Sequence, residues 1–520
     1  MMFRLQYKNC LTARCLLKKL KIFFYVQSVL LCIYVIYSGR GALSPSPSDY
    51  RNLRALPSSQ EIDTRVKALD LIKFLSPSSL GENWHVSGID VNRQLNGKDI
   101  RNIFNVLASA DRPEEKRTPM NSGQEDQRRN SASASCSLRN IEKIQTMYKV
   151  SEVNCKQIFA GDQNATSYAI TRNKKTKKQL LSNEFYLNLS ENCEHFKTQR
   201  GYVTCPLHSD EENFPIAFSL LAYKDIEMVE RLLRLIYRPQ NYYCVHVDKK
   251  AEPGFLSAIS AISQCFQNVF IAPERVDVQW GTFSVLEPEF VCMKELWRYK
   301  KWKYFINLTG QEFPLKTNWE LVQILKAYRG ANDIEGTVKR VKKSKWTSKP
   351  PFNLTAVKGS VHIAANRDFV DFILHNKRIK TILAWVNTSR IPDETLFATL
   401  NHNPQLGIRG TYRGVPETEN STSLVKPFLT RFKNWRGPPH DFPCAGHFYR
   451  GICILSTGDL PLLGSAKQMF ANKFYLSEDS TVVSCLEELL FNRTRDETKG
   501  ISQFNSNYYS QLGFVWNQVP

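Results

Sequence analysis

Two hydrophobic periods alternate along the middle of the chain. Short, almost continuously apolar runs, typical of buried strands, occupy 214–223, 241–248, 268–273 and 303–310. Longer stretches with apolar residues on one helical face occupy 225–237, 252–266, 283–299 and 316–328. Alternating strands and helices of these lengths predict an α/β domain. Its Rossmann-like, mostly parallel sheet is covered by helices on both faces.

The ends of two predicted strands indicate where such a domain would bind a ligand. Asp248 follows the second apolar run and Gly310 ends the fourth. In parallel sheets, ligands bind beyond the carboxyl ends of the strands. We therefore expect a binding site at this edge of the sheet.

The hydrophobic pattern before residue 146 predicts a membrane anchor and a stem. Residues 22–38 are apolar except for Gln27 and Ser28, and several basic residues precede them. This length just spans a bilayer, and the basic flank predicts a cytoplasmic amino terminus; a cleaved signal peptide is the alternative. The predicted parts are a cytoplasmic tail at 1–21, the anchor at 22–38, a mostly disordered lumenal stem at 39–145, a globular domain at 146–496 and a C-terminal tail at 497–520.

Charge, sequons and cysteines narrow the class of protein. The net charge is +21, but the basic residues are scattered without interleaved aromatics, so we expect no nucleic-acid partner. Seven glycosylation sequons and ten cysteines beyond the anchor favour a lumenal body. Asn307 lies in an apolar strand and is expected to stay unmodified. The predicted glycosylation sites are Asn164, Asn188, Asn353, Asn387, Asn420 and Asn492.

Five motifs, in order, carry a family resemblance. They are YRPQNYYCVHVDKKAE, NLTGQEFPLKTNWELV, IPDETLFATL, YRGICILSTGDL and FANKF. Over about residues 150–490 the chain resembles the core 2 and I-branching β1,6-N-acetylglucosaminyltransferases, with xylosyltransferases as more distant relatives. The resemblance implies a Golgi type II membrane enzyme with a GT-A type fold, UDP-N-acetylglucosamine as donor and inversion at the anomeric carbon. An O-glycosylated glycoprotein is the implied acceptor.

The resemblance also implies that no metal or other cofactor is needed. The family lacks the D-x-D motif, and here Asp248 is followed by Lys249 and Lys250 instead of a second acid. One carboxylate among lysines is a poor site for Mg²⁺ or Mn²⁺, which take several oxygen ligands. Two cations, Arg450 and Lys473, are then expected to stabilise the leaving diphosphate.

Further roles follow from the same resemblance. Glu394 is the expected general base, although a carboxylate after Pro392 could instead cap a helix. The donor is expected to contact Leu221, Asp248, Trp280, Arg450 and Lys473. The acceptor is expected to contact Glu335, Lys342, Lys345 and Trp435, although a tryptophan is often a packing residue.

The implied disulfides are Cys155–Cys485, Cys193–Cys265, Cys244–Cys292 and Cys444–Cys453. For the last pair, with His447 between its members, a zinc site is the less favoured alternative. Cys136 and Cys205 are left over. They could pair together, or Cys136 could link two chains into a dimer.

Four features depart from the family pattern. Glu312 stands in place of an Asp, His362 in place of a frequent Tyr, and Gly437 in place of a frequent aromatic residue, and the stretch 346–359 is short. These changes leave the donor residues intact and the acceptor open. We expect β1,6-branching of galactosyl-β1,3-N-acetylgalactosamine (core 2). The alternatives are a poly-N-acetyllactosamine acceptor (I-branching) or a glycan-binding protein that has lost turnover.

Overall fold

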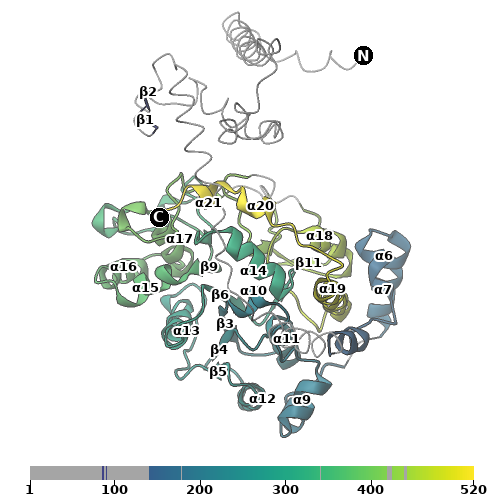
Figure 1. Cartoon of the computed structure of the whole chain (residues 1–520). Coiled ribbons are helices and arrows are strands. Elements are labelled where there is room, and N and C mark those ends of the chain that lie inside the picture. The colour runs from purple at the N-terminus through teal and green to yellow at the C-terminus, as the bar shows by residue number, and fades with distance from the viewer. Residues whose placement is uncertain are drawn as a thin grey trace, which may run out of the picture. The chain divides into compact units, whose positions relative to one another are not determined.

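The computed structural model describes residues 140–520 except 177–178, 340, 419–423 and 438–441, together with two short strands. These strands, β1 (His85–Val86) and β2 (Ile89–Asp90), pair antiparallel within a first unit, Met1–Asn121. All other elements belong to a second unit, Ser122–Pro520 (Figure 1). The predicted anchor at 22–38 lies outside the described residues. Within the described part of the chain, no helix is long and apolar enough to cross a membrane.

A six-stranded sheet forms the centre of the second unit. Its strands, in spatial order, are β5 (Val269–Ile271), β4 (Tyr242–Val247), β3 (Ile216–Ala222), β6 (Tyr304–Thr309), β9 (Ile363–Asn366) and β8 (Asp333–Ile334). The first four are parallel, which confirms the prediction, and β9 pairs antiparallel with both β6 and β8. The parallel register brings the carboxyl ends of β3, β4 and β6 to one edge.

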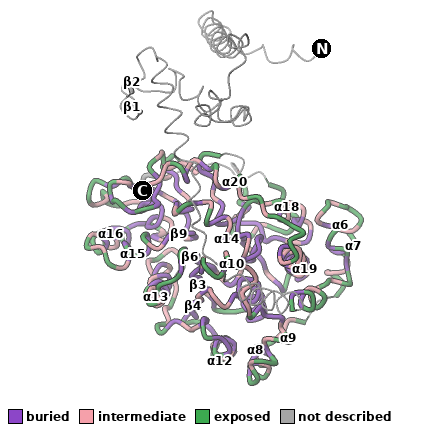
Figure 2. The backbone as a smooth tube through the Cα atoms, viewed as in Figure 1, coloured by how far each residue is buried: buried purple, intermediate pink, exposed green. Residues whose placement is uncertain are grey.

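Alternating side chains of the central strands bury both faces of this sheet. Phe218, Val245 and Ile306 pack into one hydrophobic core, whereas Cys244 and Phe305 pack into a second. The backbone of β3 and β4 is largely coloured as buried in Figure 2. The first core includes side chains of α11 (Ile226–Ile236), α12 (Pro253–Gln264) and α14 (Asn318–Ala327). The second includes side chains of α13 (Glu287–Trp297), α15 (Arg367–His375), α16 (Ile379–Asn387) and α17 (Leu396–Asn401). The predicted helices therefore cover both faces.

A smaller sheet was not predicted. It has the order β10 (Arg431–Lys433), β13 (Phe470–Asn472) and β7 (Glu312–Pro314). β7 begins three residues after the end of β6, so the small sheet starts at the carboxyl edge of the large one. A hairpin of β11 (His447–Tyr449) and β12 (Ile452–Ile454) lies beside the small sheet. The two are joined where Cys453 N–H donates to the carbonyl oxygen of Asn434, the residue after β10, at 2.8 Å.

A third core lies around the small sheet. It is covered by α6 (Cys155–Phe159), α7 (Gln163–Lys175), α18 (Leu460–Ser465) and α19 (Ser480–Thr498). The remaining helices are α8 (Asn183–Leu189), α9 (Cys193–Gln199), α10 (Ser209–Glu212), α20 (Asn507–Ser510) and α21 (Gly513–Trp516).

The globular domain extends beyond both of its predicted boundaries, residues 146 and 496. Residues 140–147 are helical, and Ile141 and Ile144 are buried in the third core. At the other end, Tyr509 and Phe514 of α20 and α21 are buried in the first core. Apolar side chains assigned to the stem and to a tail thus belong to the domain itself.

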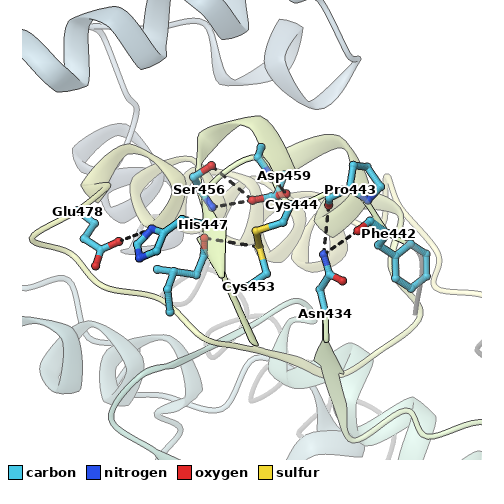
Figure 3. Close-up of a disulfide and its surroundings, with 11 residues drawn as sticks. Asn434, Phe442, Pro443, Cys444, His447, Cys453, Ser456, Asp459 and Glu478 are labelled. Atoms are coloured by element: carbon cyan, nitrogen blue, oxygen red, sulfur yellow. Dashed lines mark hydrogen bonds and ion pairs between the residues drawn. A yellow bond between two sulfur atoms is a disulfide. The ribbon is translucent and has the colours of Figure 1, made fainter. Parts of the chain in front are cut away.

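All four disulfides implied by the resemblance are present. They are Cys155–Cys485, Cys193–Cys265, Cys244–Cys292 and Cys444–Cys453. Figure 3 shows the last of these, with His447 turned toward Glu478 (Nδ1 to Oε2, 3.4 Å), so the zinc alternative is wrong. Cys136 lies outside the described residues, and Cys205 is half-buried.

The sequons differ in accessibility. The Asn307 amide is buried, donates to Glu289 Oε1 at 2.8 Å and accepts from Ile363 N–H at 2.8 Å, in agreement with its expected lack of glycosylation. Asn492 is half-buried, and Asn420 lies outside the described residues. The exposed sequon residues are Asn164, Asn188, Asn353 and Asn387.

Candidate active site

Glu394 lies in a tightly held loop. Residues Pro392–Glu394 form one 3-10 turn immediately before α17. Gly359 N–H donates to Glu394 O at 2.8 Å, and the same glycine packs against the carbonyl of Glu335 so closely that a Cβ atom would clash with it. A glycine at 359 thus permits the close approach that fixes the backbone of Glu394.

Two ammonium groups hold the Glu394 carboxylate. Its Oε2 lies 3.2 Å from Lys345 Nζ and 3.6 Å from Lys358 Nζ. Thr395, the N-cap residue of α17, makes no side-chain capping hydrogen bond. The Glu394 carboxylate faces the two lysines. Glu394 also lies in the acidic first turn that leads into α17, so a favourable helix-dipole placement and a role as base remain compatible.

Lys345 is buried within the same loop. Its Nζ also donates to the carbonyl oxygens of Arg390 (2.9 Å) and Ile391 (3.3 Å). Burial lowers the pKa of Lys345, and the Glu394 carboxylate opposes that shift. The neighbouring Asp393 has its pKa raised to about 6, first by burial and then by Glu394. The geometry thus gives Lys345 a positioning role toward Glu394, whereas its contact with an acceptor remains a prediction.

The two predicted phosphate ligands come from different elements of the same region. Arg450 occupies the turn of the β11–β12 hairpin, with φ of 51°, and Lys473 directly follows β13. Leu455 N–H, just after β12, donates to Lys473 O at 2.9 Å, which joins the hairpin to that strand end. The pKa of Lys473 is lowered, first by burial and also by Arg450, while Glu312 opposes the shift. The two cations are therefore near enough to repel each other.

A third cation that the motifs did not indicate joins them. Lys224 Nζ lies 5.6 Å from the centre of the Tyr475 ring, and Lys473 Nζ lies 5.9 Å from the same ring. Lys224 also contributes to the lowered pKa of Lys473. We call Lys224, Arg450 and Lys473 the cation cluster. Its position in the loop after β3, at a carboxyl strand end, was the available sequence signal.

The other predicted donor residues lie along the carboxyl edge of the large sheet. Gly310 N–H donates to Leu221 O at 2.9 Å, and Asp248 N–H donates to Ala222 O at 3.0 Å. The Asp248 carboxylate accepts from the backbone N–H of Lys250 at 2.8 Å and from its Nζ at 3.0 Å. Trp280, in the loop after β5, is 80% exposed.

The predicted acceptor residues are spread over three places. Glu335 is half-buried, and its charge acts on the buried ammonium of Lys433 together with that of Glu394. Trp435 is 42% exposed and pairs by its backbone with Ile452, beside the Arg450 hairpin. Lys342 is exposed, on the turn before Lys345. The sequence reasoning missed Lys433, although it lies two residues before Trp435.

Two further findings concern alternative sites. A surface hollow of about 330 Å³ lies between α15 and residues 407–409, and none of the predicted site residues lines it. Among the described residues, no group of three or more His, Cys, Asp or Glu side chains is arranged to hold a metal ion.

Comparison with known proteins decides the family. Residues 216–463, from the start of β3 into α18, match the family model "Branch: Core-2/I-Branching enzyme". Human beta-1,3-galactosyl-O-glycosyl-glycoprotein beta-1,6-N-acetylglucosaminyltransferase 3 is 37% identical over 366 residues, which cover 65% of this chain and 82% of that protein. The chain belongs to the Core-2/I-Branching enzyme family.

Two further relatives show the same extent of similarity. The mouse protein of the same name is 36% identical over 363 residues, covering 65% of this chain and 83% of its own length. A bovine herpesvirus 4 (strain LVR140) beta-1,3-galactosyl-O-glycosyl-glycoprotein beta-1,6-N-acetylglucosaminyltransferase is 37% identical over 366 residues, covering 65% and 82%. The matched family segment contains Glu394 and Arg450, and Lys473 lies ten residues beyond its end.

Proposed function

We propose that this chain is an inverting β1,6-N-acetylglucosaminyltransferase of the GT-A type. It would transfer N-acetylglucosamine from UDP-N-acetylglucosamine to the 6-hydroxyl of an O-glycan bearing galactosyl-β1,3-N-acetylgalactosamine. The observation that carries the proposal is that Lys224, Arg450 and Lys473 lie close together in the loops that follow β3, β11 and β13. The Glu394 carboxylate is not part of this group and is paired with Lys345 and Lys358. The family and the names of its relatives supply the donor and acceptor classes.

The proposed reaction needs one base and one anion site. Glu394 accepts the proton of the acceptor 6-hydroxyl as its oxygen attacks the anomeric carbon from the face opposite the diphosphate. The bond from that carbon to the diphosphate oxygen breaks, and UDP leaves with the electron pair. Arg450 and Lys473 stabilise the charge that develops on the diphosphate, since fixed cations act strongly on charge that forms in the transition state.

We also propose that the reaction needs no divalent metal. The side chain of Lys250 lies 3.0 Å from the Asp248 carboxylate and 2.9 Å from that of Asp277. A cation that already pairs with these two carboxylates competes with a metal ion for them. The cation cluster supports the alternative, in which side chains neutralise the leaving group.

A second candidate function differs from the first in its acceptor. Gly437 stands where the family resemblance implies a frequent aromatic residue, and it has a positive φ of 86°. Without an aromatic side chain at this position, the acceptor is less closely defined. A poly-N-acetyllactosamine acceptor with the same donor is therefore the second candidate.

The proposed cellular setting follows from the sequence. Residues 1–21 would be cytoplasmic, 22–38 a signal-anchor and the catalytic domain lumenal, as in a Golgi type II membrane protein. The membrane and a glycoprotein acceptor would be its partners.

The test is a transfer assay with the full-length chain in mild detergent. UDP-N-acetylglucosamine is supplied with each acceptor glycan in EDTA, and the product linkage is determined by NMR. We expect a β1,6 product in chelator. Glu394→Gln should lower transfer by roughly 10²- to 10⁴-fold with little change in UDP affinity. Transfer that requires added Mn²⁺ would contradict the metal-free mechanism, and normal turnover by Glu394→Gln would contradict the base assignment.

A further inference from the structure

Two of the positions at which this chain departs from its family contact each other. His362 Nε2 lies 2.6 Å from Glu312 Oε1, although the residues are 50 positions apart. Glu312 begins β7 of the small sheet, and His362 directly precedes β9 of the large one. The two atoms are close, but the ring N–H is not well aligned with this oxygen, so the contact does not have the geometry of a full hydrogen bond. Both side chains are buried.

Glu312 connects the contact to the cation cluster. Its carboxylate accepts from Arg431 Nε at 2.8 Å and from Asn472 Nδ2 at 3.0 Å, and Asn472 immediately precedes Lys473. Glu312 and Asn472 are also direct partners across the β7–β13 pair. Burial alone would raise the pKa of Glu312, but Arg431 and then His362 outweigh it and lower the pKa to about 2. The ionised carboxylate therefore holds the end of β13 in place, directly before Lys473.

His362 connects the contact to the loop of the base. Its Nδ1 lies 3.1 Å from Ser360 Oγ, which accepts a hydrogen bond from Lys433 Nζ at 2.8 Å. Ser360 follows Gly359, whose N–H holds the backbone of Glu394. Burial lowers the pKa of His362 to about 4, with Lys433 adding to the shift and Glu312 opposing it. The neutral ring can then accept from Ser360 at Nδ1 and present its Nε2–H toward Glu312.

We propose that Glu312 and His362 are a matched pair of positioning residues that set Lys473 relative to Glu394. The inference rests on the proposed function. A Glu reaches one methylene farther than the Asp found in relatives, and a His is shorter than the Tyr. The longer acid and the shorter ring together span the distance between the two loops. Either residue exchanged alone leaves a gap or a clash, and both exchanged together fit again.

The experiment is a double-mutant cycle with Glu312→Asp, His362→Tyr and the double variant, using the full-length chain. Each single exchange should lower kcat by roughly 10- to 100-fold, because a small misplacement of reacting groups has effects of this size. The Michaelis constant for the donor should change less than kcat. The double variant should recover to within about threefold of the unmodified chain, since contacting residues are not additive. Thermal unfolding of all four proteins is measured in parallel.

Matched controls use the same exchanges at exposed ion pairs. Glu194→Asp, beside Lys197, and His375→Tyr, beside Asp371, should leave kcat unchanged singly and together. The conservative variants His362→Gln and His362→Asn give a second measurement. Gln places its amide near the Nε2 position and should retain more activity than Asn, whose amide lies near the Nδ1 position.

Each outcome decides one question. Additive losses in the double variant, single variants with normal kcat, or Asn outperforming Gln would overturn the pairing. Unfolding of all three cycle variants would assign the pair a purely structural role and also overturn it. Unfolded single variants with a folded, active double variant would support it. If the unmodified chain has no transfer activity, the proposed function is refuted instead. If the two exchanges are coupled in thermal unfolding but not in kcat, the positioning role is refuted.

Discussion

Two groups of charged side chains in this protein are built on opposite principles. Between α11 and α19, the pairs among Glu227, Glu230, Arg231, Arg234 and Glu487, which we call the helix network, alternate in sign and are buried. The cation cluster of Lys224, Arg450 and Lys473 brings three charges of one sign together, with Asp225, 4.0 Å from Lys224 Nζ, as a partial counter-charge at its edge. Buried charges of opposite sign satisfy one another, and losing one leaves its partner unpaired, whereas charges of one sign attract a ligand of opposite charge.

The helix network is self-sufficient. Arg234 Nη1 lies 2.6 Å from Glu230 Oε2, and Arg231 Nε donates to Glu487 Oε2 at 3.1 Å. Arg200 adds a further contact to Glu230 at 2.8 Å. With every charge matched inside the protein, removing one member of this network leaves its partners buried and unpaired, which lowers folding stability.

Breaking the helix network should have the largest effect. Glu487→Gln leaves Arg231 and Arg234 buried without their common partner, which should reduce the free energy of unfolding by about 3–5 kcal/mol. Chemical denaturation measures this loss, and transfer per folded molecule should not change. Glu194→Gln, at an exposed pair with Lys197, is the control and should cost about 0.5 kcal/mol or less. An equal loss in both variants would contradict the comparison.

Acid should act on the same network with a defined sign. Burial would raise the pKa of Glu230, but Arg234 and Arg200 outweigh it and lower the pKa to about 2 from the usual 4.5. A lowered pKa means that the stabilisation is present above about pH 4.5 and is lost as the pH falls toward 2. Integrated over that window, this carboxyl contributes about 3 kcal/mol. Urea unfolding between pH 5.5 and 3 measures the slope, which should be shallower in Glu230→Gln; an unchanged slope would argue against this origin.

Removing a charge from the cation cluster should affect catalysis and not folding. Lys473→Met should lower transfer by roughly 10²-fold and weaken UDP binding, because a group that stabilises the leaving charge is lost. Thermal stability should hold or rise slightly, since repulsion with Arg450 is relieved. Steady-state kinetics, UDP titration and thermal unfolding provide the measurements. Lys473→Arg, which keeps the charge, should retain more activity; a parallel loss of stability and activity in Lys473→Met would show a structural role instead.

The smallest effect is expected at the edge of the cluster. Lys224 is more exposed than Lys473, so salt screens it more, and Lys224→Met should reduce transfer by about fivefold at low salt and less at high salt. Lys326→Met, which removes an exposed lysine paired with Asp210, is the matched control. A salt-independent loss, or an equal loss in the control, would exclude Lys224 from the site.

Much of the fold could be predicted because its signals are local. The strands β3, β4 and β6 are long enough for continuous apolar runs, β5 lies within the apolar run 268–273, and α11 shows a clear helical face. The strands of the small sheet have three residues each, too short for any period to register. The packing of Tyr509 and Phe514 was missed because a short apolar stretch does not reveal which distant core it packs against.

The candidate site shows the same division. The motifs indicated Arg450, Lys473 and Glu394 as candidates, because these residues stand in recognisable sequence surroundings. The motifs could not show that Glu312 and His362 contact each other, because the two residues are far apart in the sequence and come together only in the folded chain. Lys433 and Ser360 were missed for the same reason, since a contact between side chains on different elements has no sequence period.

The bond between Cys155 and Cys485 joins residues separated by 330 positions. On a ribosome that adds 5–20 residues per second, the first sulfur waits roughly 15 to 65 s before the second has been synthesised. During that interval earlier thiols, including those of Cys193 and Cys244, are available to it as wrong partners. Maturation of this chain therefore depends on thiol exchange after translation, and its yield should follow the oxidoreductase capacity of the compartment in which it folds.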